Sequence, residues 1–319
     1  MKREVLVSVV VVTYNSAQYI VETLESIKAQ TYKNIEIIIS DDASSDDTIA
    51  ITSEWLEYNK LNFKKYQIVE SSINTGVTCN CNRGIKIASG DYIKIIAGDD
   101  LLLSNCVEDL LKYSIKNNLK IAFGKVIPFT DNSDKEYELK LMRYEKLMYE
   151  LFDLDEKTQY RSLLTGFHVY ITGLFLSREL IVQLGGFDEQ YKMMEDYPFI
   201  IKVSSMGYKL NMLDKYVVKY RVRSIETQRA KFFFSKRKKV HASDLSIFQK
   251  KELLPRLKKE KMYMEVYDLY ISRLAKNVDD MNDSILFAYL SKIIGYLSIN
   301  KFKNKVKMMK ILKKSNFNL

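Results

Sequence analysis

The strongest constraint on the fold is a pair of short, unbroken apolar runs near the start of the chain. Leu6–Thr13 reads LVSVVVVT, and Ile35–Ser40 reads IEIIIS. Runs rich in β-branched residues, without strict alternation, are typical of strands buried on both faces of a parallel sheet. A secretion signal is the alternative for the first run, but no small-residue cleavage site follows it. No apolar run reaches the ~20 residues needed to cross a bilayer.

Helical patterns alternate with these strands as far as residue 116. Apolar residues recur at helical spacing in segments that predict helices at 17–30, 46–58, 78–88 and 105–116. Further strands are expected at 66–70 and 92–96. Ser45 is a candidate N-cap of the second helix. The alternation predicts βαβ units and therefore an α/β fold, with a Rossmann-like, mostly parallel central sheet flanked by helices.

Polar side chains follow three of the predicted strands, at the ends where a parallel sheet binds its ligands. Thr13–Asn15 follows the first strand, Asp41 and Asp42 follow the second, and Asp99 and Asp100 follow the strand at 92–96. Each cluster alone also fits an ordinary turn, because Asp, Asn and Ser are common turn formers. Their convergence on one edge is stronger evidence for a ligand site than any single cluster.

Asp99 and Asp100 are candidate metal ligands. Two carboxylates at a sheet edge can hold Mg²⁺ or Mn²⁺ through oxygen atoms, with substrate phosphates completing the coordination. The ion would neutralise charge on a departing diphosphate. The alternative is a plain strand-to-helix turn. Cys79 and Cys81 lack the second pair of Cys or His residues that a zinc site needs.

Glu195 and Asp196 form a second candidate site, just ahead of the apolar segment 199–203. Asp196 can act as a general base that takes a proton from a hydroxyl group. Alternatively, Asp196 is the N-cap of a helix, since Pro198 suits the first helical turn. The residues alone leave both interpretations open.

The C-terminal part of the chain is basic, and the net charge of +10 favours anionic partners. Lysine-rich stretches there interleave with aromatic and aliphatic residues, as in KFFFSKRKKV and KFKNKVKMMKILKK. We expect two domains, 1–228 and a basic helical region at 229–319. This region fits docking on an anionic membrane surface or a solvated helical face. Nucleic acid is disfavoured, because no recognised binding module accompanies the basic stretches.

The ordered set of motifs resembles the inverting family 2 glycosyltransferases with the GT-A fold. Their opening runs strand, T-Y-N, a helix ending S-x-x-x-Q-T-Y, a second strand and D-D-x-S-x-D-x-T. This chain follows that order in SVVVVTYNSAQYIVETLESIKAQTYKNIEIIISDDASSDDT. The similarity continues through NTG, NRGI, ASGDYI, GDD, GGFDE and ED, and it covers residues 5–225. Each piece is unspecific, but the ordered set is highly specific.

The resemblance implies roles at the donor side. Asp42 would hydrogen-bond the nucleotide base with Asp41 nearby, and the backbone from Val12 to Tyr14 would flank the base. Asp100 would bind Mn²⁺ or Mg²⁺ on the diphosphate. Asp99 would contact the ribose or donor sugar and support the metal.

The resemblance also implies the reaction. Asp196 would be the catalytic base, with Glu195 beside it, in a single displacement with inversion. The donor would be a nucleotide sugar, with UDP expected, and the acceptor a glycan or a polyprenyl-diphosphate-linked sugar. Such an enzyme would build a bacterial capsule or O-antigen polysaccharide in the cytoplasm, peripherally on the inner face of the membrane. The three sparse cysteines suit a reducing compartment, and homo-oligomerisation stays open.

Three positions depart from the family pattern. Ala97 stands where the family often has an acid, so metal binding would rest on Asp99 and Asp100, with Asp100 doing most of it. Asn80-Cys81-Asn82 replaces Ala-Arg-Asn, which leaves Arg83 to supply a base or phosphate contact. Arg223 replaces the His of a late Tyr-Arg-x-His, so it can grip a diphosphate but cannot ligate a metal.

Two other functions compete with this interpretation. A sugar nucleotidyltransferase would need a glycine-rich, basic phosphate loop after the first strand, and VVTYNSAQY has neither glycine nor a basic residue. A non-catalytic accessory protein that keeps the fold and binds nucleotide sugar is the other alternative.

Overall fold

The computed structural model describes residues 4–131, 148–166, 169, 171–222 and 239–271. The chain divides into two compact units, Met1–Ser246 and Ile247–Leu319. The boundary expected after residue 228 falls outside the described residues and stays a prediction. In the second unit, the described helical segments are residues 247–248, η4 (Gln249–Leu253), α10 (Leu254–Lys259) and residues 263–271. Among the helices described in either unit, none combines the length and the apolar character that a membrane span requires.

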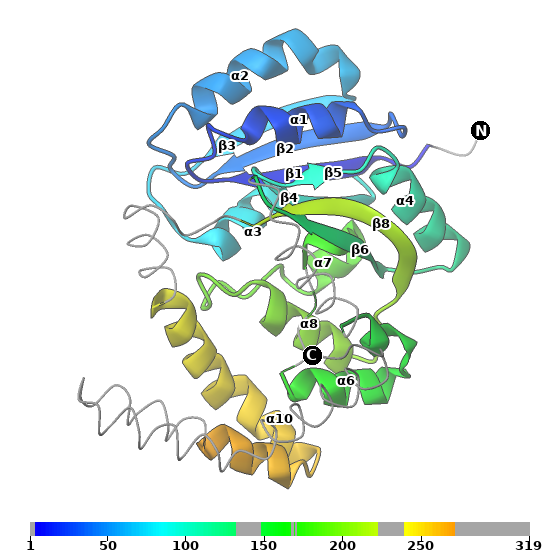
Figure 1. Cartoon of the computed structure of the whole chain (residues 1–319), viewed down its shortest axis with the longest axis vertical. Coiled ribbons are helices and arrows are strands. Elements are labelled where there is room, and N and C mark those ends of the chain that lie inside the picture. Colours follow the sequence, from blue (N-terminus) through cyan, green and yellow to red (C-terminus); the bar gives the residue numbers. More distant parts are fainter. Residues whose placement is uncertain (1–3, 132–147, 167–168, 170, 223–238, 272–319) are drawn as a thin grey trace, which may run out of the picture. The chain divides into compact units, whose positions relative to one another are not determined.

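In the described part of the first unit, eight strands form one mixed sheet in the order β3-β2-β1-β4-β7-β6-β8-β5 (Figure 1). The strands β3, β2, β1 and β4 are mutually parallel, and β6 is parallel to β8. β7 is antiparallel to β4 and β6, and β5 is antiparallel to β8. The expected α/β fold with a mostly parallel sheet is therefore confirmed. The strands are β1 (Val7–Thr13), β2 (Ile35–Asp41), β3 (Lys65–Glu70), β4 (Tyr92–Ala97), β5 (Leu101–Leu102), β6 (Ile121–Phe129), β7 (Leu174–Ser177) and β8 (Met212–Arg221).

Helices cover both faces of this sheet. α1 (Ile20–Lys28), α2 (Thr48–Asn59) and α4 (Cys106–Lys116) share one apolar core with the β1 and β2 side chains of one face. α3 (Val77–Ile87) packs on the other face (Figure 1). Successive side chains of a strand point to opposite faces of the sheet. Because helices cover both faces, β1 is buried along nearly its whole length. This two-sided burial explains the unbroken apolar runs. Later helices are α6 (Glu156–Leu164), α7 (Arg178–Gln183) and α8 (Asp196–Ser205).

The expected start of α2 is wrong by two residues. The helix begins at Thr48 with Asp47 in the cap position, so Ser45 is not its N-cap. Ser45 instead donates its N–H to the Asn15 side-chain oxygen at 2.8 Å. Ser45, which resembled a helix start in the sequence, therefore links the loop after β2 to the loop after β1.

One position of α3 leaves no room for a side chain. A Cβ at Gly84 would lie 2.4 Å from Cγ1 of Val10 and 3.2 Å from Cβ of Ser40. Both neighbours belong to buried central strands. Close packing of α3 on β1 and β2 therefore depends on glycine here, and this packing positions the start of α3 at the carboxyl edge of the sheet.

We expect Gly84→Ala to lower the free energy of unfolding by about 1–3 kcal/mol, because the added methyl overpacks a tight contact between helix and sheet. Urea denaturation measures the change. The matched control is Lys86→Ala, on the exposed side of the same helix, which should stay within about 0.5 kcal/mol of wild type. Equal stability of Gly84→Ala and wild type would contradict the close packing.

Candidate active site

The three polar clusters expected at the sheet edge lie on neighbouring strands. β1 pairs with β2 on one side and with β4 on the other. In this register Thr13 lies opposite Asp41, and Val12 lies opposite Ala97. The loops after β1, β2 and β4 therefore leave the sheet side by side, at the edge where parallel sheets bind ligands. Val12 and Tyr14 are half-buried at this edge.

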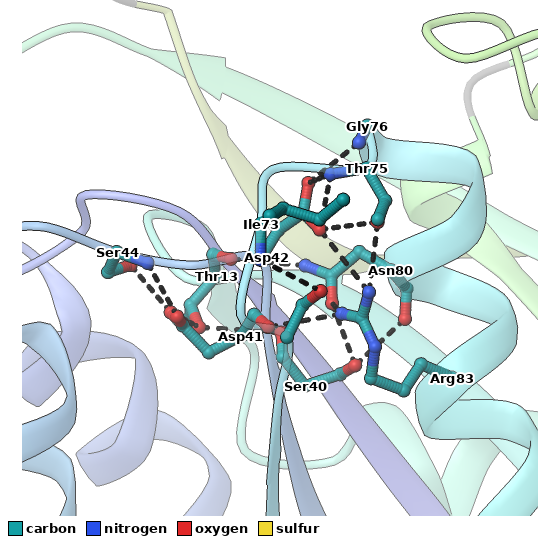
Figure 2. A network of polar contacts seen from close by, with 11 residues as sticks. Thr13, Ser40, Asp41, Asp42, Ser44, Ile73, Thr75, Gly76, Asn80 and Arg83 are labelled. Carbon is teal, nitrogen blue, oxygen red and sulfur yellow. Dashed lines mark hydrogen bonds and ion pairs between the residues drawn. The ribbon is translucent and has the colours of Figure 1, made fainter.

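The Asp41 carboxylate orders the loop after β2. It is buried, and its Oδ2 accepts the hydroxyl of Thr13 at 2.7 Å and that of Ser44 at 2.6 Å (Figure 2). Its Oδ1 accepts the N–H of Ser44 at 2.7 Å. Ala43 takes a positive φ of 63° within this tight loop. These bonds make Asp41 a support for the loop that carries Asp42.

The Asp42 carboxylate joins the β2 loop to the start of α3. It is 2% exposed and accepts the N–H of Gly76 at 2.8 Å and the hydroxyl of Thr75 at 2.6 Å (Figure 2). The N–H of Thr75 lies 3.0 Å from Oδ1. Arg83 Nη2 completes the set with an ion pair to Oδ1 at 3.4 Å. Asp42 is therefore held by four donors.

Arg83 lies on α3 and faces the two aspartates (Figure 2). Its Nη1 donates to the carbonyl of Asp41 at 3.1 Å and to Oδ1 of Asn80 at 2.8 Å. Asn80, one turn earlier on the helix, donates its own amide to the carbonyl of Thr13 at 3.0 Å. The Arg83 side chain keeps 19% of its surface exposed. The structure thus brings Arg83 to Asp41 and Asp42, and it offers a reachable positive charge there.

Asp99 and Asp100 follow β4 directly but differ in exposure. Asp100 is 1% exposed, and its Oδ1 accepts the N–H of Arg221 at 2.9 Å. Burial raises the pKa of the Asp100 carboxyl well above its usual range, and the neighbouring charge of Asp99 raises it further. The Arg221 N–H and the charges of Lys94 and Arg221 act in the opposite direction. Asp99 is only half-buried.

These two carboxylates suit a hard divalent cation. Carboxylate oxygens are the donors that Mg²⁺ and Mn²⁺ prefer, and a positive ion would relieve the repulsion that raises the pKa of Asp100. Within the described ranges, no three His, Cys, Asp or Glu side chains are grouped to hold a metal. Substrate phosphates and water would therefore have to complete the coordination, as in many Mg²⁺ sites. Asp100 as the main ligand stays a prediction.

Two buried cations near this loop were missed by the sequence analysis. Lys94, inside β4, is fully buried and donates to the carbonyls of Ile95 and Leu174, both at 3.3 Å, and to that of Thr172. Burial lowers the pKa of its ammonium group. Arg221 ends β8 beside Asp100. The sequence did contain a signal for Lys94, because it stands within an apolar run that predicts a buried strand. Lysine is almost never fully buried without a partner.

Asp196 is the first residue of α8, and Glu195 occupies the cap position without a side-chain capping bond. The alternative interpretation of Asp196 as the N-cap is therefore wrong. Its Oδ1 accepts the N–H of Tyr197 at 2.7 Å. Glu195 and Asp196 are both half-buried, and a carboxylate in the first turn is stabilised by the helix dipole. Arg223 lies outside the described residues.

The segment that leads to Asp196 is fastened to the start of α3. The N–H of Thr78 donates to the carbonyl of Lys192 at 3.3 Å. Gly76 has a φ of 96°, and a Cβ there would lie only 2.6 Å from the same carbonyl oxygen. The start of α3 therefore contacts both Asp42 and the chain just before Asp196.

Comparisons with known proteins agree with this architecture. The Escherichia coli protein "UDP-Glc:alpha-D-GlcNAc-diphosphoundecaprenol beta-1,3-glucosyltransferase WfaP" is 26% identical over 230 residues, which are 71% of this chain and 81% of that protein. An "Uncharacterized glycosyltransferase" of Haemophilus influenzae is 29% identical over 228 residues, which are 70% of this chain and 67% of that protein. The solved structure of the mannosyltransferase PcManGT from Pyrobaculum calidifontis, in complex with GDP-Man and Mn²⁺, has a TM-score of 0.55 at 17% identity. That match covers 97% of this chain and 85% of the other, and it concerns the fold alone.

The family model described as Glycosyl transferase family 2 matches residues 8–185 of the 319. The matched range includes β1, β2, β4 and the loops with Asp41, Asp42, Asp99 and Asp100. Since the match spans more than half of the chain, the protein belongs to glycosyl transferase family 2.

Proposed function

We propose that this glycosyltransferase moves a sugar from a UDP-activated donor to a hydroxyl group of a glycan or of a polyprenyl-diphosphate-linked acceptor, with inversion at the anomeric carbon. The observation that carries the proposal is the position of two polar groups on one sheet edge. Asp42 follows β2 and pairs with Arg83 of α3, and Asp99 and Asp100 follow β4, with β1 between the two strands. A nucleotide sugar that lies across β1 can contact one group with its base and the other with its diphosphate.

At the nucleotide end, Asp42 and Arg83 contact the base, Asp41 holds the loop, and the backbone from Val12 to Tyr14 flanks the base. The 3.4 Å contact with Arg83 is the longest that Asp42 makes. It is therefore the contact that an incoming base N–H replaces most readily, while Arg83 keeps its bonds to Asn80, Thr75 and the carbonyl of Asp41. The name of WfaP, which specifies a UDP-glucose donor, supports uridine as the base.

At the diphosphate end, Asp99 and Asp100 hold Mn²⁺ or Mg²⁺, which supplies charge stabilisation for the leaving nucleoside diphosphate. The PcManGT complex, whose description names GDP-Man and Mn²⁺, supports this use of a metal. Asp99 also contacts the ribose or the donor sugar, and Arg223 adds positive charge beside the diphosphate. The bond between the anomeric carbon and the diphosphate oxygen breaks, and its electron pair stays on that oxygen of UDP.

At the acceptor side, Asp196 takes the proton of the attacking hydroxyl, with Glu195 beside it. The acceptor oxygen bonds to the anomeric carbon on the face opposite the departing UDP, which inverts the configuration. Holding base and electrophile in one rigid frame removes much of the entropic cost of the reaction. The tight contact between Gly76 and Lys192 supports such a frame.

We further propose that the enzyme works peripherally at the cytoplasmic face of a bacterial membrane, in capsule or O-antigen synthesis. The name of WfaP specifies a diphosphoundecaprenol-linked acceptor. The basic stretches at 231–240 and 301–314 would bind anionic lipid. Almost all of these residues lie outside the described part, so this step depends on the sequence.

A panel of nucleotide sugars tests the donor class, because weak hydrolysis reports the donor without an acceptor. We expect the full chain to release UDP from one UDP-sugar when Mn²⁺ or Mg²⁺ is present. Diphosphate released from a nucleoside triphosphate would instead identify a sugar nucleotidyltransferase. Donor binding without hydrolysis or transfer, across the panel, would identify an accessory protein.

We expect Asp196→Asn to lower acceptor-dependent kcat by roughly 10²–10⁴-fold, as loss of a general base does, while UDP affinity stays unchanged. Steady-state transfer and UDP titration measure the two effects. Asp153→Asn, an exposed aspartate of η2 (Glu150–Asp153), is the control and should match wild type. Near-normal transfer by Asp196→Asn would remove Asp196 from the mechanism.

Asp100→Asn should separate stability from activity. Burial disfavours the ionised carboxylate, so the neutral amide should raise the free energy of unfolding at about pH 7 by on the order of 1 kcal/mol. Metal-dependent transfer should be lost. Because the folded pKa of Asp100 is raised, the folded state binds this proton more readily than the unfolded state. The stability advantage of the variant should therefore shrink as pH falls toward about 4.

Urea denaturation with a chelator present, from about pH 4 to about pH 8, measures this difference. Asp153→Asn should show no such pH dependence. An Asp100→Asn variant less stable than wild type at neutral pH would show that the ionised carboxylate is favoured by its neighbours.

A further inference from the structure

We propose that Arg221 is the positioning residue that presents the Asp99–Asp100 loop to the divalent cation of the donor. The inference deepens the proposed function and rests on it. Arg221 is the last residue of β8, beyond the range 8–185 of the family match, and its side chain is only 4% exposed. The family resemblance implies a diphosphate contact for Arg223, two residues further along the chain.

Arg221 contacts both aspartates of the loop. Its backbone N–H donates to Oδ1 of Asp100, and its Nε donates to the carbonyl of Asp99, both at 2.9 Å. One residue therefore fixes the carboxylate of Asp100 and the backbone of Asp99. Asp99 is half-buried, whereas Asp100 is buried. The side chain of Arg221 therefore holds Asp99, the more accessible of the two aspartates.

Further bonds hold the loop, and two of them lie at its ends, while the N–H of Asp100 closes the turn by donating to the carbonyl of Ala97 at 3.2 Å. The N–H of Gly98 donates to the carbonyl of Val12 at 2.9 Å. The carbonyl of Asp100 accepts the hydroxyl of Thr23 at 2.8 Å. The Nε bond of Arg221 lies between these two anchors, at the peptide that sets the direction of the Asp99 side chain.

The guanidinium group is itself held from several directions. The rings of Tyr19 and Phe129 lie 4.4 Å and 4.6 Å from its central carbon. Nη2 pairs with Glu22 at 2.7 Å, and Nη1 pairs with Asp131. The planar guanidinium group of arginine can contact two carboxylates, a carbonyl and two aromatic rings at the same time. The compact ammonium group of lysine cannot.

A purely structural role for these ion pairs is the competing explanation. The side chains of Glu22 and Asp131 are 55% and 40% exposed. Solvent therefore reaches both carboxylates and partly screens the two ion pairs, although the guanidinium group itself is buried. They do, however, orient the guanidinium group, and the partly buried Nε bond passes that orientation to Asp99. We therefore expect changes at Arg221 to affect metal binding more than unfolding.

The test uses the full chain with Arg221→Lys and Arg221→Gln. Each variant keeps the backbone N–H to Asp100 and removes the guanidinium, with its bond to the carbonyl of Asp99 and its ion pairs to Glu22 and Asp131. Glu22→Gln is a milder variant on an exposed residue, useful if the others fail to fold. Arg178→Lys is the matched control, because Arg178 also donates its Nε to a carbonyl, that of Ala88, at 2.7 Å.

Three quantities are measured for each variant: UDP affinity by calorimetry across a Mn²⁺ titration, hydrogen exchange of peptides covering 97–103, and the unfolding temperature. We expect Arg221→Lys to need roughly 10-fold more Mn²⁺ for half-maximal UDP binding, the loss typical of residues that orient metal ligands. UDP affinity without metal should be unchanged, since Asp41, Asp42 and Arg83 are untouched. Exchange at 97–103 should be faster, and saturating Mn²⁺ should restore most of the binding. Glu22→Gln should shift in the same direction by less, and Arg178→Lys should match wild type.

The proposal is overturned if folded Arg221→Lys and Glu22→Gln show wild-type Mn²⁺ dependence, or if metal-free UDP affinity falls as much as metal-dependent affinity. Failure of the proposed function looks different. If wild type hydrolyses no sugar nucleotide, yet the Mn²⁺ dependence of UDP binding still shifts in the variants, the role of Arg221 stands and the transfer reaction does not. If wild type transfers sugar and Arg221→Lys has unchanged Mn²⁺ dependence, the transfer reaction stands and the role of Arg221 does not.

Discussion

The rest of the candidate site depends on the hydrogen bonds that the carboxylate of Asp42 accepts from the residues just before α3. The N–H groups of Thr75 and Gly76 both donate to this one carboxylate, at 2.8 to 3.1 Å. A negative charge at this end of α3 is stabilised by the helix dipole. On its other side, Gly76 packs against the carbonyl of Lys192, on the way to Asp196. The backbone at Thr75 and Gly76 therefore helps to position both the loop that carries Asp42 and the segment that leads to α8.

The loop after β4 follows a different principle, in which charges are buried at a cost. Burial raises the pKa of Asp100 and lowers that of Lys94, so in both cases the surroundings oppose the charged form. The cost is offset by donors and acceptors: Arg221 donates to the loop, and backbone carbonyls accept from Lys94. Perturbed groups of this kind cluster at functional sites, where the fold gives up some stability to hold a reactive arrangement.

The local sequence pattern was sufficient to predict which loops meet at the edge of the sheet. It was not sufficient to predict the contacts that their side chains make. The strands β1, β2 and β4 and their loops follow from short apolar runs ended by polar residues, so the convergence of Asp41, Asp42 and the Asp99–Asp100 pair was predictable. The start of α2 was not, because Ser45 bonds to Asn15 of another loop instead of capping its own helix. The exposures of Asp99 and Asp100 were not predictable either, since neighbours in sequence are shielded by different segments.

By itself, the sequence determined the α/β class, the strands that carry the polar loops and the family to which the chain belongs. The tertiary structure decided which carboxylates are buried and which cations meet them. Arg221 reaches Asp100 across 121 positions of the chain, and Arg83 reaches Asp42 across 41. Side-chain periodicity is a property of a few consecutive residues, whereas burial and ion pairing depend on segments that meet only when the sheet has formed.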